Sequence, residues 1–167
     1  MRRPWNIIDW PIYSLSTIDS EVKTNMNICT YVTAISMKPK MYLISIEYNS
    51  KTYQNLINTK TSYLQILNIN QSGLVKVFGK KSGTNFNKNE YLERNKLTFK
   101  WKEGEVLKDC CAYLKLKKNN IVKNDADHAH FFFDVLNFKT ISESNVLSYQ
   151  HLVQNKIILW QLIMIGF

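Results

Sequence analysis

The fold is decided by residues 27–56, which read NICTYVTAISMKPKMYLISIEYNSKTYQNL. Residues 28–37 are rich in β-branched and small side chains, a composition that is typical of a strand. Alternate positions of residues 42–48 are apolar, so this segment is predicted to be a second, largely buried strand. Pro39 lies between the two segments. Because proline removes a hydrogen-bond donor from a sheet, we expect a turn over residues 37–40.

The same stretch continues through a polar turn at residues 49–52 into a predicted helix from residue 53. Ser50 or Thr52 is expected to cap this helix, because a hydroxyl oxygen can accept a hydrogen bond from the free N–H groups of a first helical turn. Residues 86–104 are expected to be irregular or briefly helical. Further strands are predicted at residues 12–16, 64–69, 112–117 and 129–138, and short helices at residues 74–78 and 148–156.

This pattern predicts a mostly β protein with short helices, in a single domain that spans residues 1–167. A closed or partly closed β-barrel fits the pattern, although periodicity alone also permits a sandwich. Residues 1–20 contain two prolines and three aromatic side chains before any clear period, so they are expected to form an N-terminal arm. Residues 157–167 form an atypical apolar tail that is about half as long as a membrane helix, and no membrane span is expected.

The composition describes a basic protein with an apolar core. Of the residues, 45% are hydrophobic, and the formal net charge is +9. Such a charge favours anionic partners, namely nucleic acid, acidic lipid or a phosphate-bearing cofactor. The three cysteines, Cys29, Cys110 and Cys111, form no Cys-x-x-Cys pair, so we expect free thiols in a reducing compartment. No apolar secretory signal is recognised at residues 1–6, and a cytoplasmic protein is expected.

Nucleic-acid binding requires clustered basic side chains that are interleaved with aromatic ones. Here the lysines are spread from Lys23 to Lys156, and arginine occurs only at Arg2, Arg3 and Arg94. An ordinary solvated basic surface is therefore the preferred interpretation. No Gly-x-Gly-x-x-Gly, phosphate-loop or Gly-x-Ser-x-Gly sequence is present, so Rossmann, nucleotide-triphosphatase and hydrolase functions have no support.

Three turns carry hydroxyl and basic side chains, which are the groups that bind a phosphate dianion together with backbone N–H groups. Taken alone, these residues are more typical of ordinary surface turns, which is the preferred interpretation before any resemblance is considered. The three groups are Thr30, Thr33 and Ser36; Ser50, Lys51 and Thr52; and Lys80, Lys81, Ser82 and Gly83.

Two histidines share one face of a predicted strand. His128 and His130 follow Asp125 and Asp127, and two histidines with two carboxylates could hold a metal ion. No third histidine or cysteine with ligand spacing lies nearby. A hydrogen-bonded or substrate-facing histidine is therefore preferred to a metal site.

Several stretches, taken in order, resemble the flavin reductases of the FMN-binding split-barrel fold. Residues 25–40 are similar to the strand and turn that lie along the flavin ring in that family, and residues 49–56 to the phosphate-side turn and its helix. Residues 78–83 resemble the loop before a family lysine, here Lys88, and residues 127–135 resemble the Gly-Asp-His strand. The chain departs from the family pattern at Ala126, which replaces the glycine before that Asp-His pair, and in having only Pro39 after the first strand.

The resemblance implies a site for FMN, or alternatively FAD, at the interface of a homodimer, with NAD(P)H as co-substrate. Strand residues would meet the ring, the turn at 50–52 would hold the phosphate, and the loop at 81–83 would close that side. His128 would lie near the reactive face of the ring, as a positioning or proton-donating residue, although a purely structural role is also open. The implied cofactor-binding residues are Thr30, Tyr31, Thr33, Ala34, Ile35, Ser36, Ser50, Lys51, Thr52, Lys81, Ser82, Gly83 and Lys88.

The function implied by the resemblance is an FMN-dependent NAD(P)H:flavin oxidoreductase, in which the cofactor carries out the redox chemistry. A hydride would pass from the nicotinamide to flavin N5, and electrons would then reach free flavin, an oxygenase partner or ferric iron. Two alternatives stay open. One is a flavin-binding electron-transfer module without efficient nicotinamide oxidation, suggested by Ala126 and the tail. The other is a non-enzymatic basic β-barrel that binds nucleic acid, suggested by the +9 charge.

Overall fold

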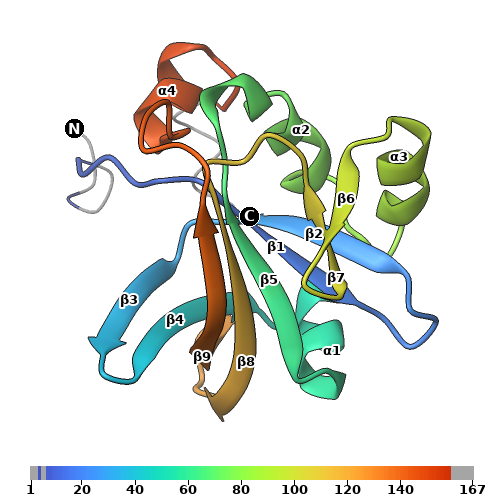
Figure 1. The fold of residues 1–167 in the computed structure, drawn as a ribbon, viewed down its shortest axis with the longest axis vertical. Helices are drawn as coiled ribbons and strands as arrows, with labels where there is room; N and C mark the ends of the chain where they lie inside the picture. The colour runs from blue at the N-terminus through green and yellow to red at the C-terminus, as the bar shows by residue number, and fades with distance from the viewer. Residues whose placement is uncertain (1–3, 5–6, 159–167) are drawn as a thin grey trace.

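The computed structural model describes residue 4 and residues 7–158, and its centre is a seven-stranded antiparallel sheet with the strand order β2-β1-β5-β8-β9-β4-β3 (Figure 1). Strands β6 and β7 form a separate two-stranded hairpin. The strands are β1 (Tyr13–Ile18), β2 (Thr24–Cys29), β3 (Val32–Met37), β4 (Lys40–Glu47), β5 (Thr61–Ile66), β6 (Thr98–Trp101), β7 (Gly104–Leu107), β8 (Ala112–Val122) and β9 (His128–Thr140). The helices are α1 (Lys51–Asn58), the 3-10 helix η2 (Ile69–Gln71), α2 (Leu74–Phe78), α3 (Lys88–Arg94) and α4 (Tyr149–Gln154).

The large sheet curls into an incompletely closed barrel. Strands β2 and β3 are its two edges, yet only Thr30 and Tyr31 separate them in the chain. Because two residues span less than about 10 Å, the end of β2 and the start of β3 must lie close together. They are joined by the chain and not by a hydrogen-bonded ladder among the strand pairs of the described residues. This arrangement confirms the predicted mostly β fold with short helices and resolves the choice between barrel and sandwich.

The barrel interior is filled by side chains from all seven strands and from α1. Phe131 and Phe133 of β9 stack with ring centroids 6.2 Å apart and are fully buried, as is Leu56 of α1. The alternation predicted from the sequence explains this arrangement, because every second residue of each strand faces inward. Helix α1 therefore closes one end of the barrel and has a fixed position relative to β1 and β2.

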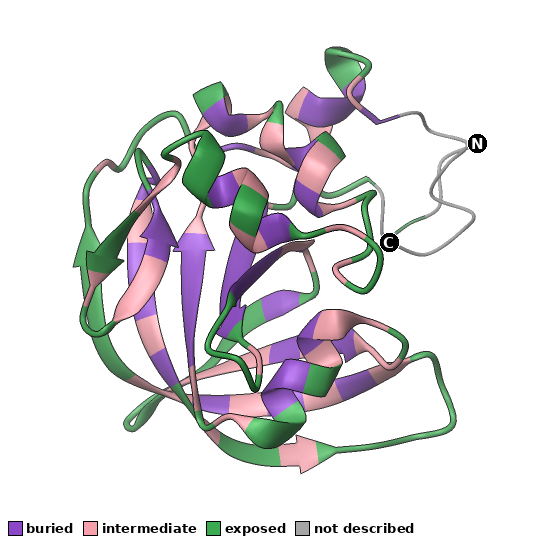
Figure 2. Ribbon diagram, turned by 90° about the vertical axis from the view of Figure 1, so that its right-hand side faces the viewer, coloured by how far each residue is buried: buried purple, intermediate pink, exposed green. Residues whose placement is uncertain are grey.

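A second core lies on the outer face of the sheet. There, α2, α3, α4 and the β6–β7 hairpin cover β1, β2, β5 and β8, and the buried residues in Figure 2 continue between these layers. Phe78 of α2, Leu92 of α3 and Leu152 of α4 are buried in this layer. In Figure 1 these helices lie at the top and α1 lies at the bottom. The segment between α2 and α3 therefore reaches the edge of the sheet next to β2.

Several local predictions are confirmed, and three differ. Ser50 caps α1, and residues 38–39 form the turn between β3 and β4. The strand predicted over residues 28–37 is divided at Thr30–Tyr31, because the chain there passes from one edge of the sheet to the other. The arm expected over residues 1–20 ends earlier, since residues 13–18 form β1 inside the sheet. Residues 86–104 contain α3 and β6, and the predicted tail lies outside the described residues from residue 159 onward.

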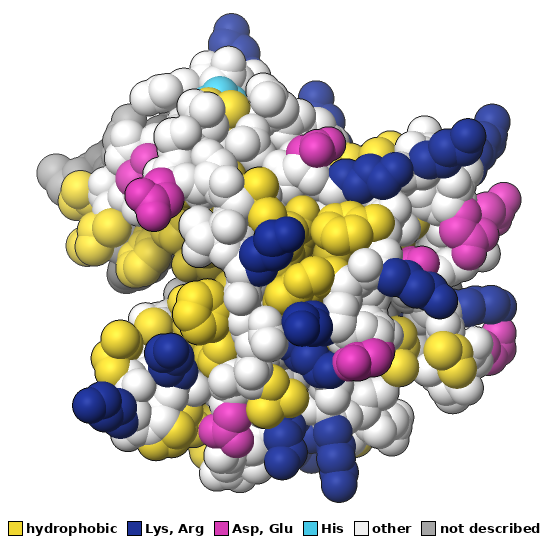
Figure 3. Space-filling model, in the orientation of Figure 1, with side chains coloured by type: hydrophobic (Ala, Val, Ile, Leu, Met, Phe, Trp, Pro, Cys, Tyr) yellow, Lys and Arg dark blue, Asp and Glu magenta, His cyan; other side chains and the backbone are white. Residues whose placement is uncertain are grey.

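The cysteines and the surface charge agree with free thiols and a dispersed basic surface. Cys29, Cys110 and Cys111 are buried and form no disulfide, and burial raises the pKa of Cys29 and Cys110 to about 12. On the face seen in Figure 3, lysine and arginine side chains occur singly and in small groups, with apolar, acidic and other side chains between them. Within the described residues, no helix is both long enough and apolar enough to cross a bilayer.

Candidate functional site

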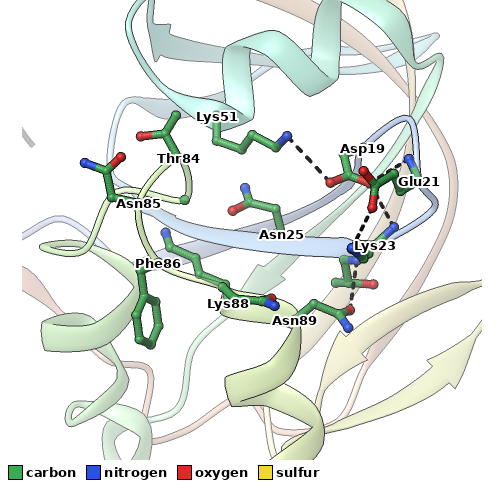
Figure 4. A pocket seen from close by; sticks show the side chains of 13 residues that line it. Asp19, Glu21, Lys23, Asn25, Lys51, Thr84, Asn85, Phe86, Lys88 and Asn89 are labelled. Atoms are coloured by element: carbon green, nitrogen blue, oxygen red, sulfur yellow. Dashed lines mark hydrogen bonds and ion pairs between the residues drawn. The ribbon is translucent and has the colours of Figure 1, made fainter.

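A polar recess of about 310 Å³ opens between the β1–β2 hairpin, the start of α1 and the segment that leads into α3 (Figure 4). We call this cavity the recess, and residues 79–87 the recess loop. Segments far apart in the sequence supply its walls, and most of the side chains are charged or amide-bearing. The lining residues are Asp19, Glu21, Lys23, Thr24, Asn25, Lys51 and residues 83–89.

The turn from β4 into α1 presents Lys51 to the recess. The Ser50 hydroxyl accepts a hydrogen bond from the Tyr53 N–H at 3.1 Å and donates to the Glu47 carbonyl at 2.8 Å. The Thr52 side chain is buried and accepts a hydrogen bond from the Asn25 amide at 3.2 Å. Both hydroxyls are therefore engaged within the protein. Of the trio predicted to hold a phosphate, Lys51 is the residue that lines the recess.

A buried polar network holds α1 against the sheet and so determines where Lys51 lies. The Asn25 amide of β2 donates to Thr52, and the Asn55 amide of α1 donates to the Thr17 hydroxyl of β1 at 3.1 Å. All four side chains are buried. Because a buried amide or hydroxyl without a partner costs free energy, these pairs specify one docking position for the helix.

Gly83 lets the recess loop lie directly against this network. A Cβ atom at Gly83 would lie 2.4 Å from Asn25 Oδ1 and 3.1 Å from Lys51 Cβ. Any larger residue would therefore displace the loop or the side chains of Asn25 and Lys51. This close approach is the reason that glycine is needed at this position, and it brings two of the predicted phosphate segments together.

The two residues that follow the recess loop, Lys88 and Asn89, bind the unpaired backbone groups on the free edge of β2. The Asn89 side chain accepts a hydrogen bond from the Thr24 N–H at 3.0 Å. The Lys88 ammonium donates to the carbonyls of Met26 at 2.8 Å and Phe78 at 2.9 Å. Lys88 is buried, and this burial lowers its pKa to about 8. Two of its three N–H groups thus connect the edge of β2 to the end of α2.

An ion pair crosses the recess. Asp19 Oδ1 accepts the backbone N–H groups of Glu21 and Lys23, each at 3.0 Å, while Asp19 Oδ2 lies 3.5 Å from Lys51 Nζ (Figure 4). Partial burial of the carboxylate opposes its ionisation, but the two N–H groups and the Lys51 ammonium outweigh it and lower the pKa of Asp19. The side chain of Lys51 is 29% exposed and that of Asp19 is 16% exposed.

His128 lies beside the turn that leads into α1. Its Nδ1 is 2.6 Å from Asp127 Oδ1, and its ring meets the ring of Tyr31 edge-on at 5.3 Å between centroids. The hydrogen bond from His128 lowers the pKa of Asp127. The Tyr48 N–H donates to the Asp127 carbonyl at 3.1 Å, so the pair is tied to the end of β4. Ala126 has no positive φ, and this turn therefore does not require the glycine of the family pattern.

His130 is held by a different set of bonds. Asn124 Oδ1 accepts the Ala126 N–H at 2.9 Å, which leaves Asn124 Nδ2 to donate to His130 Nε2 at 2.9 Å. His130 therefore carries its proton on Nδ1 and donates to the Ser45 hydroxyl at 2.8 Å. In this tautomer His130 does not act as a base toward Ser45. Within the described part of the chain, no three His, Cys, Asp or Glu side chains gather as metal ligands.

Strand β3 is an edge strand and carries a β-bulge. Its register against β4 shifts between Ala34 and Ser36, which leaves Ile35 as the extra residue. One side of an edge strand has unpaired backbone N–H and C=O groups, and a bulge changes the direction in which these groups point. Ala34 and Ser36 also line a second, mainly apolar concavity of about 260 Å³, which extends to Phe138 of β9. We call it the second concavity.

The predicted site residues fall into three groups in space. Lys51, Gly83 and Lys88 line the recess, with Lys81 and Ser82 in the loop beside it. The ring of Tyr31 packs edge-on against the ring of His128. The predicted residues of β3 are residues 33–36, which lie along the edge strand, and Ala34 and Ser36 among them line the second concavity. Sequence reasoning missed Asp19 and several amides of the recess. Asn25 left a signal in the sequence, as a polar residue at an inward-facing strand position, whereas Asp19 lies in the β1–β2 turn and left none.

Comparison with protein families identifies the class of protein. The profile of the flavin reductase like domain family matches residues 7–156. The chain therefore belongs to this family, which confirms the resemblance described above. A comparison with curated protein sequences gave no match.

Solved structures share the fold at low sequence identity. An FMN-binding protein from Thermus thermophilus, solved with 1-cyclohex-2-enone, has a TM-score of 0.75 and 17% identity, with 89% of this chain and 86% of that chain covered. The NADH:FAD oxidoreductase of Streptomyces globisporus C-1027, solved with NAD and FAD fragments, has a TM-score of 0.70 and 15% identity, covering 83% and 79%. A candidate oxidoreductase from Sinorhizobium meliloti 1021 has a TM-score of 0.74 and 16% identity. It is matched over 87% of this chain but only 48% of its own length. The fold is therefore the FMN-binding split barrel.

The buried Lys88 makes the stability of the protein depend on pH. The pKa of Lys88 is about 8 in the folded protein, whereas a lysine in an unfolded chain titrates near ~10.4. The unfolded state thus holds this proton more tightly, and between these values the free energy of unfolding rises with pH. Relative to Lys88→Met, we expect the wild-type protein to gain about 1.4 kcal/mol from pH 7 to pH 9, measured by urea unfolding. If the difference in the free energy of unfolding between the wild type and Lys88→Met did not change with pH, this account would be contradicted. The control is Lys76→Met, a substitution of an exposed lysine.

Proposed function

We propose that this protein is an NAD(P)H:flavin oxidoreductase whose FMN phosphate binds in the recess. One observation carries the proposal: the two turns that the family resemblance assigns to the phosphate side contribute Lys51 and Gly83 to one cavity, which the family lysine Lys88 also lines. Membership of the flavin reductase like domain family supports a flavin ligand. The Streptomyces relative of the same fold acts on NADH and FAD, which supports a nicotinamide co-substrate and leaves FAD as an alternative flavin.

The residues present suit a flavin phosphate. Lys51 supplies a cation, and the start of α1 supplies N–H groups that have no partner within the helix, an arrangement that favours anions. Gly83 allows the backbone of the recess loop to approach closely. In this proposal Lys81 and Ser82 close the phosphate side of the site, while Lys88 holds the loop in place through its two carbonyl bonds.

The ring of the flavin is proposed to lie along β3. The free edge of β3 around Thr33, Ala34 and Ile35 offers backbone groups for the polar edge of the ring, and Ser36 follows on the same strand. Thr30 and Tyr31 connect this edge with the recess side of the barrel. A flavin held there would supply the redox chemistry, namely hydride acceptance from the nicotinamide and electron transfer to free flavin, an oxygenase partner or ferric iron.

The visible spectrum of the purified protein tests this function directly. We expect FMN absorbance that bleaches when NADH or NADPH is added without oxygen, because the nicotinamide reduces the bound flavin. A flavin spectrum that does not bleach would instead favour the electron-transfer module. A colourless protein that also fails to bind added FMN would overturn the proposal and return attention to the basic surface.

His128 is proposed to position the nicotinamide or to donate a proton at the reactive face. Its Asp127 partner and the Tyr31 ring fix its orientation. His128→Asn should leave the affinity for FMN within about twofold and slow anaerobic flavin reduction by about 10- to 100-fold, as measured by stopped-flow absorbance. His151→Asn on α4 is the control. An unchanged reduction rate in His128→Asn would assign His128 a purely structural role.

A homodimer with the flavin at its interface is proposed for the face around the second concavity. Two apolar side chains that line this concavity are exposed: Met37 of β3 is 74% exposed and Phe138 of β9 is 56% exposed. Lys40 lies over the Phe138 ring at 4.9 Å. Exposed apolar side chains around a concavity are a common feature of protein interfaces. A second copy of the chain would cover this surface next to β3.

Replacing Phe138 by a charged residue tests the dimer. We expect Phe138→Asp to shift sedimentation from dimer to monomer and to weaken FMN binding about tenfold or more, because the second wall of the site is lost. Val122→Asp, on an exposed apolar residue at the far end of β8, should have neither effect. A wild-type protein that sediments as a monomer with FMN bound would rule out the interface.

A further inference from the structure

The recess contains an anion of its own, placed where it faces the cation proposed to bind the flavin phosphate. Asp19 Oδ2 lies 3.5 Å from Lys51 Nζ, and the pair spans the recess from the β1–β2 hairpin to α1 (Figure 4). Both side chains are less than one-third exposed, so water screens this attraction less than it screens a surface pair.

The carboxylate cannot easily move away when another anion arrives. Its other oxygen accepts the N–H groups of Glu21 and Lys23, and the hairpin also contains the bonds from the Asp19 N–H to the Lys23 carbonyl and from the Val22 N–H to the Asp19 carbonyl. Lys51, by contrast, reaches the pair through a flexible side chain. An incoming phosphate must therefore share Lys51 with Asp19, or draw it away, and it remains beside a fixed negative charge.

The other charges of the recess do not offset this effect. Glu21 adds a second carboxylate, which pairs with Lys23. Lys88 donates to two backbone carbonyls, and neither carboxylate pairs with it among the ion pairs of the described residues. Lys51 is therefore the lysine of the recess for which Asp19 and a phosphate compete.

We propose that Asp19 is a built-in competitor for the flavin phosphate at Lys51, and that it keeps the flavin exchangeable instead of permanently bound. This inference rests on the proposed function, since it assumes that the phosphate binds at Lys51. It identifies Asp19 as a residue that sets affinity for phosphorylated flavins and leaves recognition of the ring unchanged. The protein would then release reduced flavin readily to an acceptor.

Riboflavin has the ring of FMN but lacks its phosphate. A comparison of the binding of the two flavins therefore separates the contribution of the phosphate from that of the ring. The full chain is freed of flavin by dialysis and titrated with each flavin, and the quenching of flavin fluorescence gives the dissociation constants. Asp19→Asn keeps an oxygen for the two hairpin N–H groups but removes the charge. Asp19→Ser is a second uncharged variant in case the first folds poorly. Glu143→Gln removes an exposed carboxylate that does not line the recess and is the matched control.

We expect both Asp19 variants to bind FMN about tenfold more tightly and to release it more slowly, because a like charge near the phosphate is removed. Riboflavin binding should stay within about twofold, and Glu143→Gln should resemble the wild type. In a Lys51→Met background the gain from Asp19→Asn should largely disappear, because the competition acts through Lys51.

Three results would overturn the inference. FMN affinity could be unchanged or weaker in both Asp19 variants, riboflavin could gain as much as FMN, or the gain could persist in Lys51→Met. In each case FMN still binds, and the proposed function stands. If none of the proteins binds either flavin, the proposed function fails and the inference fails with it.

Discussion

The recess depends on how the free edge of β2 is satisfied. An edge strand exposes N–H and C=O groups that would otherwise pair with a neighbouring strand. Here the Thr24 N–H is taken by the Asn89 side chain, and the Met26 carbonyl is taken by the Lys88 ammonium. Two consecutive side chains thus replace a missing strand. They hold the recess loop against the barrel without closing it, and the gap that remains is the recess.

This arrangement also explains why a buried lysine is tolerated. Burying a charged ammonium is costly, and the lowered pKa of Lys88 expresses that cost. The two carbonyl bonds offset part of it, and both can be donated by either protonation state of the amine. The lysine therefore acts as a connector between β2 and α2. The cation that faces the recess is Lys51, and its position follows from the buried amide network beneath α1.

Local patterns predicted much of the fold. Alternating apolar residues located β4 and β8, and a run of three phenylalanines located β9. The helix cap at Ser50 was recognisable because a hydroxyl before a helix has a specific partner. The break at Thr30–Tyr31 was not predictable in this way. Residues on both sides of it have strand propensity, and only the curvature of the whole sheet separates them. Propensity describes single segments, whereas the closure of a barrel is a property of all its strands.

The candidate site was predictable in part for the same reason. The family resemblance selected Lys51, Gly83 and Lys88, and the structure places all three in the recess. It did not indicate that Thr52 is buried against Asn25, or that Asp19 faces Lys51. These contacts are between residues of different strands and turns, so they cannot be predicted from the spacing of residues along the chain. Sequence supplied the chemical groups, and the barrel determines which of them meet.

The most direct test of the account is a crystal structure of the protein with FMN. We expect the phosphate within hydrogen-bonding reach of Lys51 Nζ and the first N–H groups of α1, with the ring along β3 near Tyr31 and His128. A phosphate bound outside the recess, or a flavin seated away from β3, would contradict the central claim that these separate segments form one flavin site.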